Sequence, residues 1–382
     1  MTNTPEHHLN QLLSETPEAA NARVEAYLKQ HFNQARPTVL FGAGNVGAGV
    51  AQRLAKISHK PACFMDDTPT KKDTTIAGVP VMGRDEALAQ YGADCNLVVT
   101  ILNPKHNFKE TQAFFAAKGI QAMTFMGLSW FYPEAFYGMH GMTHPAKLLS
   151  MKPDILAFLN LLADEKSKVE YASQIAFRLT LDFDQLTPKE EGVYFPADVP
   201  LKFTERTTFL DAGAYDGDSI ENAHTHMGAK LQKVIAFEPD PRNYQAMVER
   251  VANLGIADKC DLHQAAVGAQ EETLFFNATG DMSAALSKTG GMEVKVEALS
   301  HHITEDNMYL KFDIEGHEET AITAVLPQIK AHKPQMAISV YHKPTDLWHI
   351  ALMLHKEVPE YTFYLRNHGI DATDVICYAL RQ

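Results

Sequence analysis

Apolar and β-branched residues gather in short runs along the second half of the chain, and several of these runs stop at an acidic residue. Thr207–Leu210 is one such run; it ends at Asp211 and is followed by small residues up to Gly217. A helix is expected to begin around Asp218. Because a short apolar run bounded by turn residues is typical of a buried strand, this stretch predicts a strand, a tight turn and a helix.

Two further runs repeat the pattern. Lys233–Phe237 ends at Glu238, and Met308–Phe312 ends at Asp313. Asp240 stands before a proline and is expected to cap the helix that follows. Strands that alternate with helices predict an α/β domain with a mostly parallel sheet, in which ligands bind outside the carboxyl ends of the strands. The acidic strand ends are therefore expected to meet at one ligand-binding edge.

The first part of the chain shows the same alternation. An amphipathic helix is expected over about Glu15–Gln34, and strands are expected at Thr38–Phe41, near Val79–Val81 and over Asn96–Leu102. This order of elements predicts a second, Rossmann-like α/β domain at the N-terminus. Two segments of the C-terminal half, 272–278 and 292–299, are expected to form an antiparallel excursion.

Glycines in G-x-G-x-x-G spacing follow the first N-terminal strand and open a helix, and the next strand ends in an acid. This context favours binding of a nucleotide, either NAD or a nucleotide-sugar. The residues expected to contact it are Gly42, Gly44, Asn45, Val46, Gly47 and Asp66. A fold retained without a ligand is an equal alternative, because the same glycines are needed where a helix lies close to a strand.

The chain has 382 residues, which is long enough for two domains. We expect an N-terminal Rossmann-like domain with a leading helix over 1–128, a helical linker over 129–191 and a second Rossmann-like domain over 192–382. In the linker, Ile155 and Phe158 belong to an apolar pattern with helical spacing.

The net charge is −13, which argues against nucleic acid or an anionic membrane surface as a partner. We see no apolar run of about 18 residues and no signal-peptide pattern. The four cysteines lie far apart outside CxxC spacing, as is typical of reduced thiols. We therefore expect a cytoplasmic protein with a small-molecule partner; whether it forms a homo-oligomer stays open.

The turn after Asp211 has the single glycine of D-x-G, whereas a dinucleotide pyrophosphate needs a closer, glycine-richer approach. S-adenosylmethionine carries no phosphate and needs carboxylates for its ammonium group and its ribose hydroxyls. Asp211, Asp216 and Asp218 offer carboxylates here, and Glu238 is placed to accept both ribose hydroxyls. The alternative is a plain turn with solvated acids.

The residues expected to bind S-adenosylmethionine lie at the strand ends and in the turns that follow them, and two alanines fall where small residues would border an adenine. They are Asp211, Ala212, Gly213, Asp216, Gly217, Asp218, Ser219, Glu238, Pro239, Ala265, Ala266 and Asp313.

The D-x-G-x-x-x-G turn, the strand end AFEPDP and above all LKFDIEGHE resemble the FkbM-type S-adenosylmethionine-dependent methyltransferases, as do AISVYHKPTDLW and YTFYLRNHG. The resemblance runs from about Gly192 to the C-terminus. It implies a class I methyltransferase fold with a mostly parallel seven-stranded sheet, and O-methylation. It also implies that Asp281 and Ser283 lie near the cofactor, with an ordinary polar hairpin loop as an equal alternative. The N-terminal part is similar to the small Rossmann domains of nucleotide-sugar enzymes.

Methyl transfer to a hydroxyl needs a base near the acceptor, and the candidates are Asp313, His317 and His342. We favour His342, because an unperturbed histidine titrates close to neutral pH; its alternative role is to orient the substrate or to cap a helix. Asp313 and Glu315 share a face, but no metal site is predicted, because the same acids are needed to fix the turn and the positive end of the cofactor. Lys311 is expected to neutralise Asp313.

The sequence thus predicts an S-adenosylmethionine-dependent O-methyltransferase acting on a small-molecule hydroxyl, with a sugar or a nucleotide-sugar-derived acceptor leading. The alternative is a catalytically inactive methyltransferase fold that acts as a scaffold and whose N-terminal half binds NAD or a nucleotide-sugar. The intact acidic strand ends favour the enzyme. A dehydrogenase is disfavoured, because no convincing catalytic set is visible in the N-terminal domain.

Overall fold

The computed structural model describes residues 4–103, 105–276, 286–287 and 292–381. The chain divides into two compact units. The N-terminal unit comprises Met1–Lys152 and Gln174–Leu186, and the C-terminal unit comprises Pro153–Ser173 and Thr187–Gln382. The segment expected to be a helical linker, 129–191, is thus shared between the two units.

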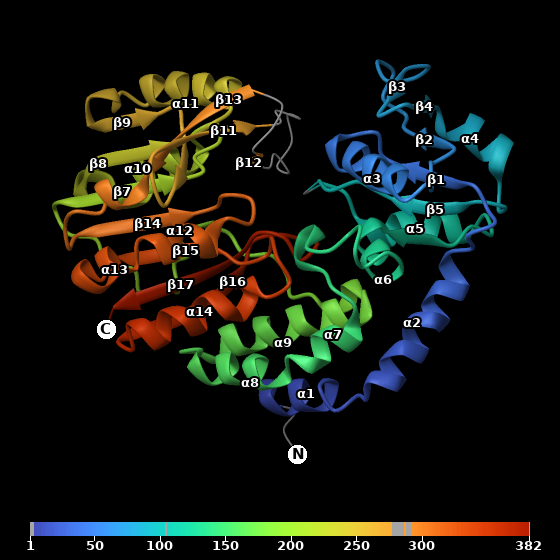
Figure 1. Cartoon of the computed structure of the whole chain (residues 1–382), viewed down its shortest axis with the longest axis horizontal. Helices are drawn as coiled ribbons and strands as arrows, with labels where there is room; N and C mark the ends of the chain where they lie inside the picture. The colour runs from blue at the N-terminus through green and yellow to red at the C-terminus, as the bar shows by residue number, and fades with distance from the viewer. Residues whose placement is uncertain (1–3, 104, 277–285, 288–291, 382) are drawn as a thin grey trace. The chain divides into compact units, whose positions relative to one another are not determined.

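The N-terminal unit is built on a six-stranded sheet in the order β3-β4-β2-β1-β5-β6 (Figure 1). Its strands are β1 Thr38–Phe41, β2 Cys63–Met65, β3 Thr75–Ile76, β4 Val79–Met82, β5 Asn96–Val99 and β6 Ala122–Thr124. Neighbouring strands are parallel except β3 and β4, which are antiparallel. Strand β5 ends before the expected Leu102, and Thr100 beyond it donates its hydroxyl to the carbonyl of Gly42.

Threonine caps start the first two helices of this unit. Its helices are α1 Pro5–Leu12, α2 Pro17–His31, α3 Asn45–Lys56, α4 Arg84–Tyr91, α5 Phe108–Ala116, α6 Leu128–Phe131 and α7 Pro145–Ser150. Thr4 and Thr16 accept hydrogen bonds from the backbone of the first turns of α1 and α2, and each is followed by proline. Helix α2 corresponds to the helix expected over Glu15–Gln34, whereas α1 is an additional helix.

The C-terminal unit carries a seven-stranded sheet in the order β16-β17-β15-β14-β7-β8-β9 (Figure 1). Its strands are β7 Thr207–Ala212, β8 Leu231–Phe237, β9 Cys260–His263, β14 Met308–Phe312, β15 Gln335–Ser339, β16 Tyr361–Asn367 and β17 Val375–Arg381. Only β17 runs antiparallel to its neighbours among these described strands. The predicted α/β class and mostly parallel sheet are confirmed.

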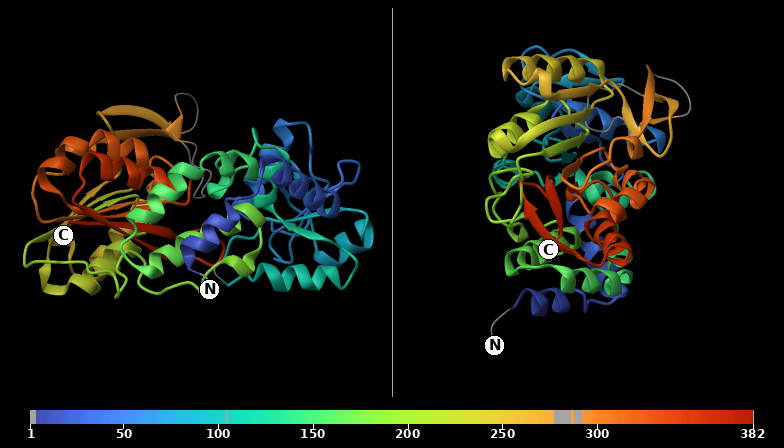
Figure 2. Two further views of the ribbon diagram at one scale, coloured as in Figure 1. Left: turned by 90° about the horizontal axis from the view of Figure 1, so that it is seen from below. Right: turned by 90° about the vertical axis from the view of Figure 1, so that its left-hand side faces the viewer.

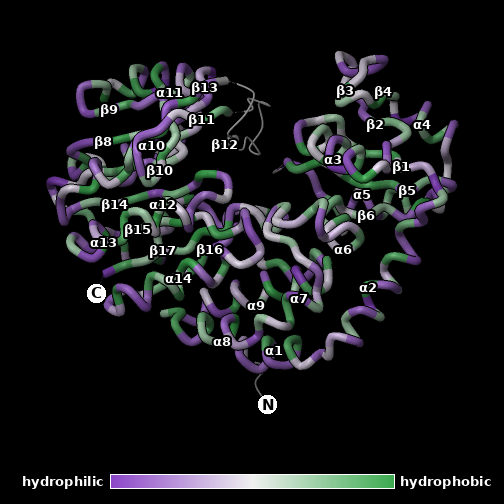
Figure 3. The backbone as a smooth tube through the Cα atoms, in the orientation of Figure 1, coloured by the Kyte–Doolittle hydropathy of each residue, from purple (hydrophilic) through white to green (hydrophobic). Residues whose placement is uncertain are grey.

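Helices cover both faces of this sheet. They are α10 Asp218–Met227, α11 Pro241–Asn253, α12 Glu318–Ala324, α13 Leu326–His332 and α14 Asp346–Glu357. Helix α8 Lys152–Leu161 belongs to the C-terminal unit from Pro153 on, and α9 Glu165–Thr180 passes from that unit into the N-terminal unit at Gln174. Helices α10 and α11 lie on one face, and α12 and α14 lie on the other (Figure 2). Hydrophobic residues follow the strands between them (Figure 3), and the central strands β7 and β14 are buried along their whole length.

A small second sheet, in the order β10-β13-β11-β12, follows β9. Its strands are β10 Ala266–Gly268, β11 Glu272–Phe276, β12 Leu286–Ser287 and β13 Met292–Ala298. Strands β11 and β13 are antiparallel, as expected for the excursion. Asp281 and Ser283, the weaker cofactor candidates, lie outside the described residues. None of the helices in the described ranges combines the length and the apolar character needed to cross a bilayer.

Candidate functional site

The turn between β7 and α10 lies against the end of β14. Gly213 has a φ of +89°, and a Cβ on it would lie 1.9 Å from the carbonyl oxygen of Asp313. Gly217 has a φ of +85° and is the N-cap residue of α10. Because a side chain at Gly213 would meet the backbone of β14, glycine is required there. The glycine turn and the acidic end of β14 are thus brought together.

Asp211 and Lys311 form a buried ion pair between β7 and β14. They face each other in the strand register, their side chains are 0% and 3% exposed, and Lys311 Nζ lies 2.9 Å from Asp211 Oδ1. Ser219 donates its hydroxyl to the other oxygen of Asp211, and Lys311 also donates to the carbonyl of Gly213 at 2.5 Å. Both oxygens of Asp211 are therefore engaged inside the unit, which favours a role in fixing the turn. The ion-pair partner of Lys311 is Asp211, while the charge of Asp313, which Lys311 was expected to neutralise, also raises the pKa of Lys311.

The remaining residues of the turn differ in exposure. Asp216 is paired with Arg250 of α11 at 2.6 Å. Asp218, the first residue of α10, is exposed and accepts a hydrogen bond from Ser219 N at 2.7 Å. Ala212 is fully buried as the last residue of β7. Of the three acids expected in and before this turn, Asp218 is the one most open to a ligand.

Glu238 follows β8 beside the same turn. Its Oε2 accepts from Tyr215 N at 3.0 Å and its Oε1 accepts from Asp240 N at 2.9 Å. Burial raises the pKa of Glu238 to about 7, although these N–H groups oppose the rise. Asn243 Nδ2 also donates to Oε1 at 3.4 Å, so Oε2 is the oxygen that keeps an acceptor site for a hydroxyl. Pro239 comes next, and Asp240 caps α11 through Arg242 N at 2.8 Å, as predicted.

Ala265 and Ala266 lie after the end of β9, and both are buried. The end of β9 is joined to the end of β8, because Glu238 N donates to the carbonyl oxygen of His263 at 3.1 Å. The two alanines therefore lie close along the chain to the segment that contacts Glu238. Their contact with an adenine ring stays a prediction.

Asp313 stands just beyond β14 and is held by a tyrosine that sequence reasoning missed. Tyr194 donates its hydroxyl to Asp313 Oδ2 at 2.7 Å, and the Asp313 side chain is 21% exposed. Tyr194 comes from an irregular segment before β7, where neither strand nor helix periodicity marks a position as important. The tyrosine fixes the carboxylate while leaving part of it accessible.

His342 follows β15 and lies among three carboxylates. Its Nδ1 is 3.0 Å from Glu318 Oε1, and its Nε2 is 3.5 Å from Asp313 Oδ1 and 3.6 Å from Glu315 Oε2. Burial lowers the pKa of His342, but the attraction of Glu318, together with Glu315 and Asp313, outweighs it and raises the pKa to about 10. At neutral pH His342 is therefore an imidazolium with no lone pair for a proton. The premise that His342 is an unperturbed histidine is wrong.

This charge state predicts a pH dependence of stability. The pKa of His342 is raised above its ordinary value of 6.5, so the stabilisation is complete below that value and is lost as the pH rises through about 10. The midpoint temperature of thermal unfolding, measured in steps from neutral to alkaline pH, should fall for the wild type. For His342→Gln it should depend less on pH. The exposed His349, paired with Glu319 at 3.2 Å, gives the control His349→Gln, which should keep the wild-type slope. Equal slopes for His342→Gln and the wild type would contradict the charged cluster.

His317 is in the opposite state. It is the N-cap residue of α12, and burial, followed by the positive charge of Lys343, lowers its pKa. Its imidazole is therefore neutral at neutral pH and able to accept a proton. The two candidate histidines thus differ in charge: the sequence analysis favoured His342 as the base, whereas the pKa shifts favour His317.

Two further acids near this edge were missed by sequence reasoning. Burial raises the pKa of Asp346, at the start of α14, to about 7, and the charge of Glu318 adds to the effect. Burial raises the pKa of Asp374, just before β17, to about 6, and the charge of Asp313 adds to it. Asp346 precedes an apolar helical run and was detectable as a helix start, whereas Asp374 lies in an irregular turn with no pattern. Several titratable groups with shifted pKa values at one edge of a sheet are typical of a functional site.

Asp313, Glu318 and His342 have ligand atoms within 4.8 Å of one another, a spacing that would suit a cation. Glu318 Oε1 already accepts from Ile314 N at 2.8 Å and faces the imidazolium of His342, so Glu318 has a cationic partner without a metal ion. The expectation that no metal is needed here stays a prediction.

In the N-terminal unit, the structure gives packing reasons for most of the glycine fingerprint. Gly42 has a φ of +112°, and a Cβ on Gly47 would lie 2.2 Å from the carbonyl oxygen of Gly42. Asp66 accepts from Ala43 N at 2.8 Å and is paired with Lys71 at 3.2 Å. Helix α3 begins at Asn45, with Val46 as its second residue. A Cβ on Gly44, in contrast, would meet nothing within 4 Å, so the packing of the unit does not require this glycine.

Comparison with known proteins gives a family match for the C-terminal part of the chain and a structural likeness for nearly all of it. Residues 211–370 match the family model of the methyltransferase FkbM domain. The crystal structure of methyltransferase FkbM from Methylobacillus flagellatus KT is similar with a TM-score of 0.70 and 22% identity, over 94% of this chain and 93% of that chain. At this identity the likeness shows a shared fold. No match to a curated protein was found.

Weaker likenesses extend to two other methyltransferase structures. Aeropyrum pernix fibrillarin with natively bound S-adenosyl-L-methionine gives a TM-score of 0.31 at 12% identity, over 48% of this chain and 70% of that chain. An rRNA methylase from Streptococcus thermophilus gives a TM-score of 0.30 at 14% identity, over 47% of this chain and 89% of that chain. Likenesses this weak do not indicate a shared function. The family match, however, shows that residues 211–370 form an FkbM methyltransferase domain and that this chain is an S-adenosylmethionine-dependent methyltransferase.

Proposed function

We propose that this protein methylates a hydroxyl group of a small molecule, and that a sugar or a nucleotide-sugar-derived compound is the leading acceptor class. The observation that carries the proposal is the partly exposed carboxylate of Asp313, fixed by Tyr194 and adjacent to the turn at Gly213. A hydroxyl group donates a hydrogen bond to such a carboxylate and must lose its proton on transfer.

The residues present suit S-adenosylmethionine. Glu238 is a buried carboxylate whose Oε2 keeps an acceptor site for a ribose hydroxyl, and it lies beside the turn that Gly213 and Gly217 shape. The exposed Asp218 is available to an ammonium group. Bound S-adenosylmethionine supplies a methyl group activated by a positive sulfur, so the work of the protein is to align the acceptor and to take its proton.

His317 is the best-suited proton acceptor in this arrangement, because its imidazole is neutral at neutral pH. Asp313 stays the second candidate, since its side chain is 21% exposed. The imidazolium of His342 lies 3.5 Å from Asp313 Oδ1 and 3.6 Å from Glu315 Oε2, so it places a positive charge beside both acids. His342 therefore supports the acids electrostatically and leaves proton abstraction to its neighbours.

Two observations support a small, hydroxyl-bearing acceptor. The net charge of −13 disfavours nucleic acid, which needs cations to neutralise its phosphates, and accords with a cytoplasmic protein that acts on small molecules. The open space at Gly44, next to the first turn of α3, is suited to a phosphate group of NAD or a nucleotide-sugar, whereas the other fingerprint residues have packing roles. The N-terminal unit would then bind the same class of molecule as the acceptor.

Calorimetric titration with S-adenosylhomocysteine tests the cofactor site. Glu238→Gln preserves size but replaces an acceptor oxygen by a donor amide, so its affinity is expected to fall about 10- to 100-fold. Gly44→Asp, in the N-terminal unit, should leave this affinity unchanged and should weaken binding of NAD or a nucleotide-sugar.

If the wild type failed to bind S-adenosylhomocysteine, the scaffold alternative would replace the enzyme. If it bound but methylated no sugar or nucleotide-sugar in a screened panel, the acceptor class alone would be wrong. Product identification by mass spectrometry would separate O-methylation from transfer to another atom.

A further inference from the structure

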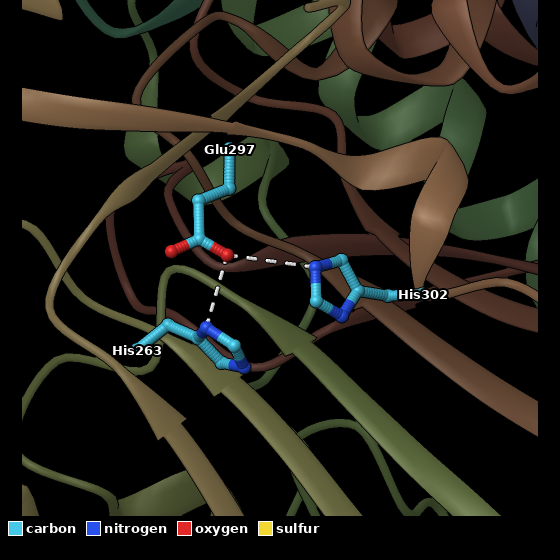
Figure 4. Close-up of side chains that lie close together, drawn as sticks. All are labelled: His263, Glu297 and His302. Atoms are coloured by element: carbon cyan, nitrogen blue, oxygen red, sulfur yellow. Dashed lines mark ion pairs between the residues drawn. The ribbon is translucent and has the colours of Figure 1, made fainter. Parts of the chain in front are cut away.

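Three side chains from separate elements converge between the two sheets of the C-terminal unit. His263 is the last residue of β9, Glu297 belongs to β13, and His302 follows the short 3-10 helix Leu299–His301. Figure 4 shows the two imidazoles pointing to one carboxylate oxygen: His263 Nδ1 lies 3.0 Å and His302 Nε2 lies 3.5 Å from Glu297 Oε2. The ligand atoms of all three lie within 4.8 Å of one another.

The two separations from Glu297 Oε2, 3.0 and 3.5 Å, are close to those of neighbouring ligands around one transition-metal ion. Zinc lies about 2.0–2.2 Å from imidazole nitrogen and carboxylate oxygen, which places neighbouring ligands of a tetrahedron roughly 3.3–3.5 Å apart. Small changes in the distances between the three ligand atoms would reach that geometry. Two imidazoles and one carboxylate favour Zn²⁺ and similar divalent metals over Mg²⁺ or Ca²⁺, which prefer oxygen ligands.

Charged groups lie behind two of the three ligands. The remote nitrogen of His263, Nε2, lies 3.2 Å from Asp261 Oδ1, and Asp261 is in turn paired with Lys233 at 3.1 Å. The second oxygen of Glu297, Oε1, accepts from Lys295 Nζ at 2.8 Å. A carboxylate behind a ligating histidine fixes the ring and raises the basicity of the ligand nitrogen.

Packing holds both rings before any ion arrives. The imidazole of His263 is stacked on Phe237 with ring centres 4.7 Å apart, and His302 meets the same phenyl ring edge-on at 5.0 Å. The three side chains are 13–18% exposed, so the cluster is accessible to a small ion. Rigid ligands lose little conformational entropy on binding, which favours affinity.

We propose that His263, Glu297 and His302 bind one divalent transition-metal ion of the zinc type, with a fourth position open to water. The ion joins β9 of the seven-stranded sheet to β13 of the small sheet. It lies near the cofactor edge, because the carbonyl of His263 accepts from the backbone of Glu238. This site does not depend on the identity of the methyl acceptor.

The test uses the full-length, untagged protein after removal of metals with a chelator. Titration with ZnCl₂ by calorimetry, and with CoCl₂ by visible absorption, should show one equivalent bound with imidazole ligation. In Glu297→Gln and His302→Asn this equivalent should bind more than about 100-fold more weakly, and in Asp261→Asn about 10- to 100-fold more weakly. Zn²⁺ should raise the midpoint temperature of thermal unfolding of the wild type and should leave that of the ligand variants unchanged.

His301→Asn is the matched control, since His301 adjoins His302 in sequence and is 66% exposed. It should bind zinc as the wild type does. Circular dichroism identical to that of the wild type establishes that each variant is folded. The proposal is overturned if the wild type binds no zinc, if Glu297→Gln and His302→Asn retain the full stoichiometry and affinity, or if the bound equivalent is lost only in variants of Glu318 and His342.

Discussion

Replacement of Lys311 by methionine is expected to lower the free energy of unfolding of the C-terminal unit by about 3–5 kcal/mol. The change leaves the carboxylate of Asp211, whose side chain is 0% exposed, without its counter-charge, and it removes the donor to the carbonyl of Gly213. An uncompensated charge in the interior is far more costly than the intact pair is stabilising. Urea denaturation followed by the fluorescence of Trp348, in a Trp130→Phe background, reports on this unit because Trp348 is its single tryptophan.

Two further proteins complete the experiment. The double variant with Asp211→Leu and Lys311→Met should recover most of the loss, because it removes both buried charges together. Lys233→Met breaks a similar pair with Asp261, whose side chains are 47% and 48% exposed, and should change stability by less than about 1 kcal/mol. If Lys311→Met proved as mild as Lys233→Met, the buried pair would not hold the turn.

The position of the site was predictable because it depends on local patterns. Apolar runs that end in Asp211, Glu238 and Asp313 identify strands and their carboxyl ends, and parallel strands bring those ends to one edge. The G-x-G-x-x-G spacing likewise placed a turn correctly between β1 and α3. What the pattern could not separate was packing from binding, since Gly42 and Gly47 serve the packing of the turn itself.

The chemistry of the individual side chains was less predictable, because it depends on partners that are distant in sequence. Alternation within β14 put Lys311 on the side of Asp313, but the strand register brings Asp211 opposite it. His342 was placed correctly after β15, yet its charge is set by Glu318, which arrives from α12. No sequence spacing marks His263, Glu297 and His302 as one cluster, because they come from a strand end, a second sheet and the position after a short helix.

The largest effect on activity is expected from His317→Gln, which should lower kcat about 10²- to 10⁴-fold while the KM for S-adenosylmethionine changes little. In the proposed mechanism the neutral imidazole of His317 accepts the proton, and glutamine cannot accept and hold a proton at neutral pH. In the wild type kcat/KM should rise with pH through the pKa of His317, which burial and Lys343 place below its ordinary value of 6.5, and should then level off. Initial rates over a pH series with an acceptor found by screening measure both effects, since the acidic limb should vanish in His317→Gln.

His332→Gln is the control for this experiment, because His332 lies on α13 and is paired with Asp306 at 2.8 Å. Its rate and pH profile should match those of the wild type. Asp313→Asn separates the two candidate bases: if His317→Gln kept the wild-type rate and acidic limb while Asp313→Asn lost activity, Asp313 would take the proton. In that case the imidazolium of His342, 3.5 Å from Asp313 Oδ1, would be a positive charge beside the reacting carboxylate.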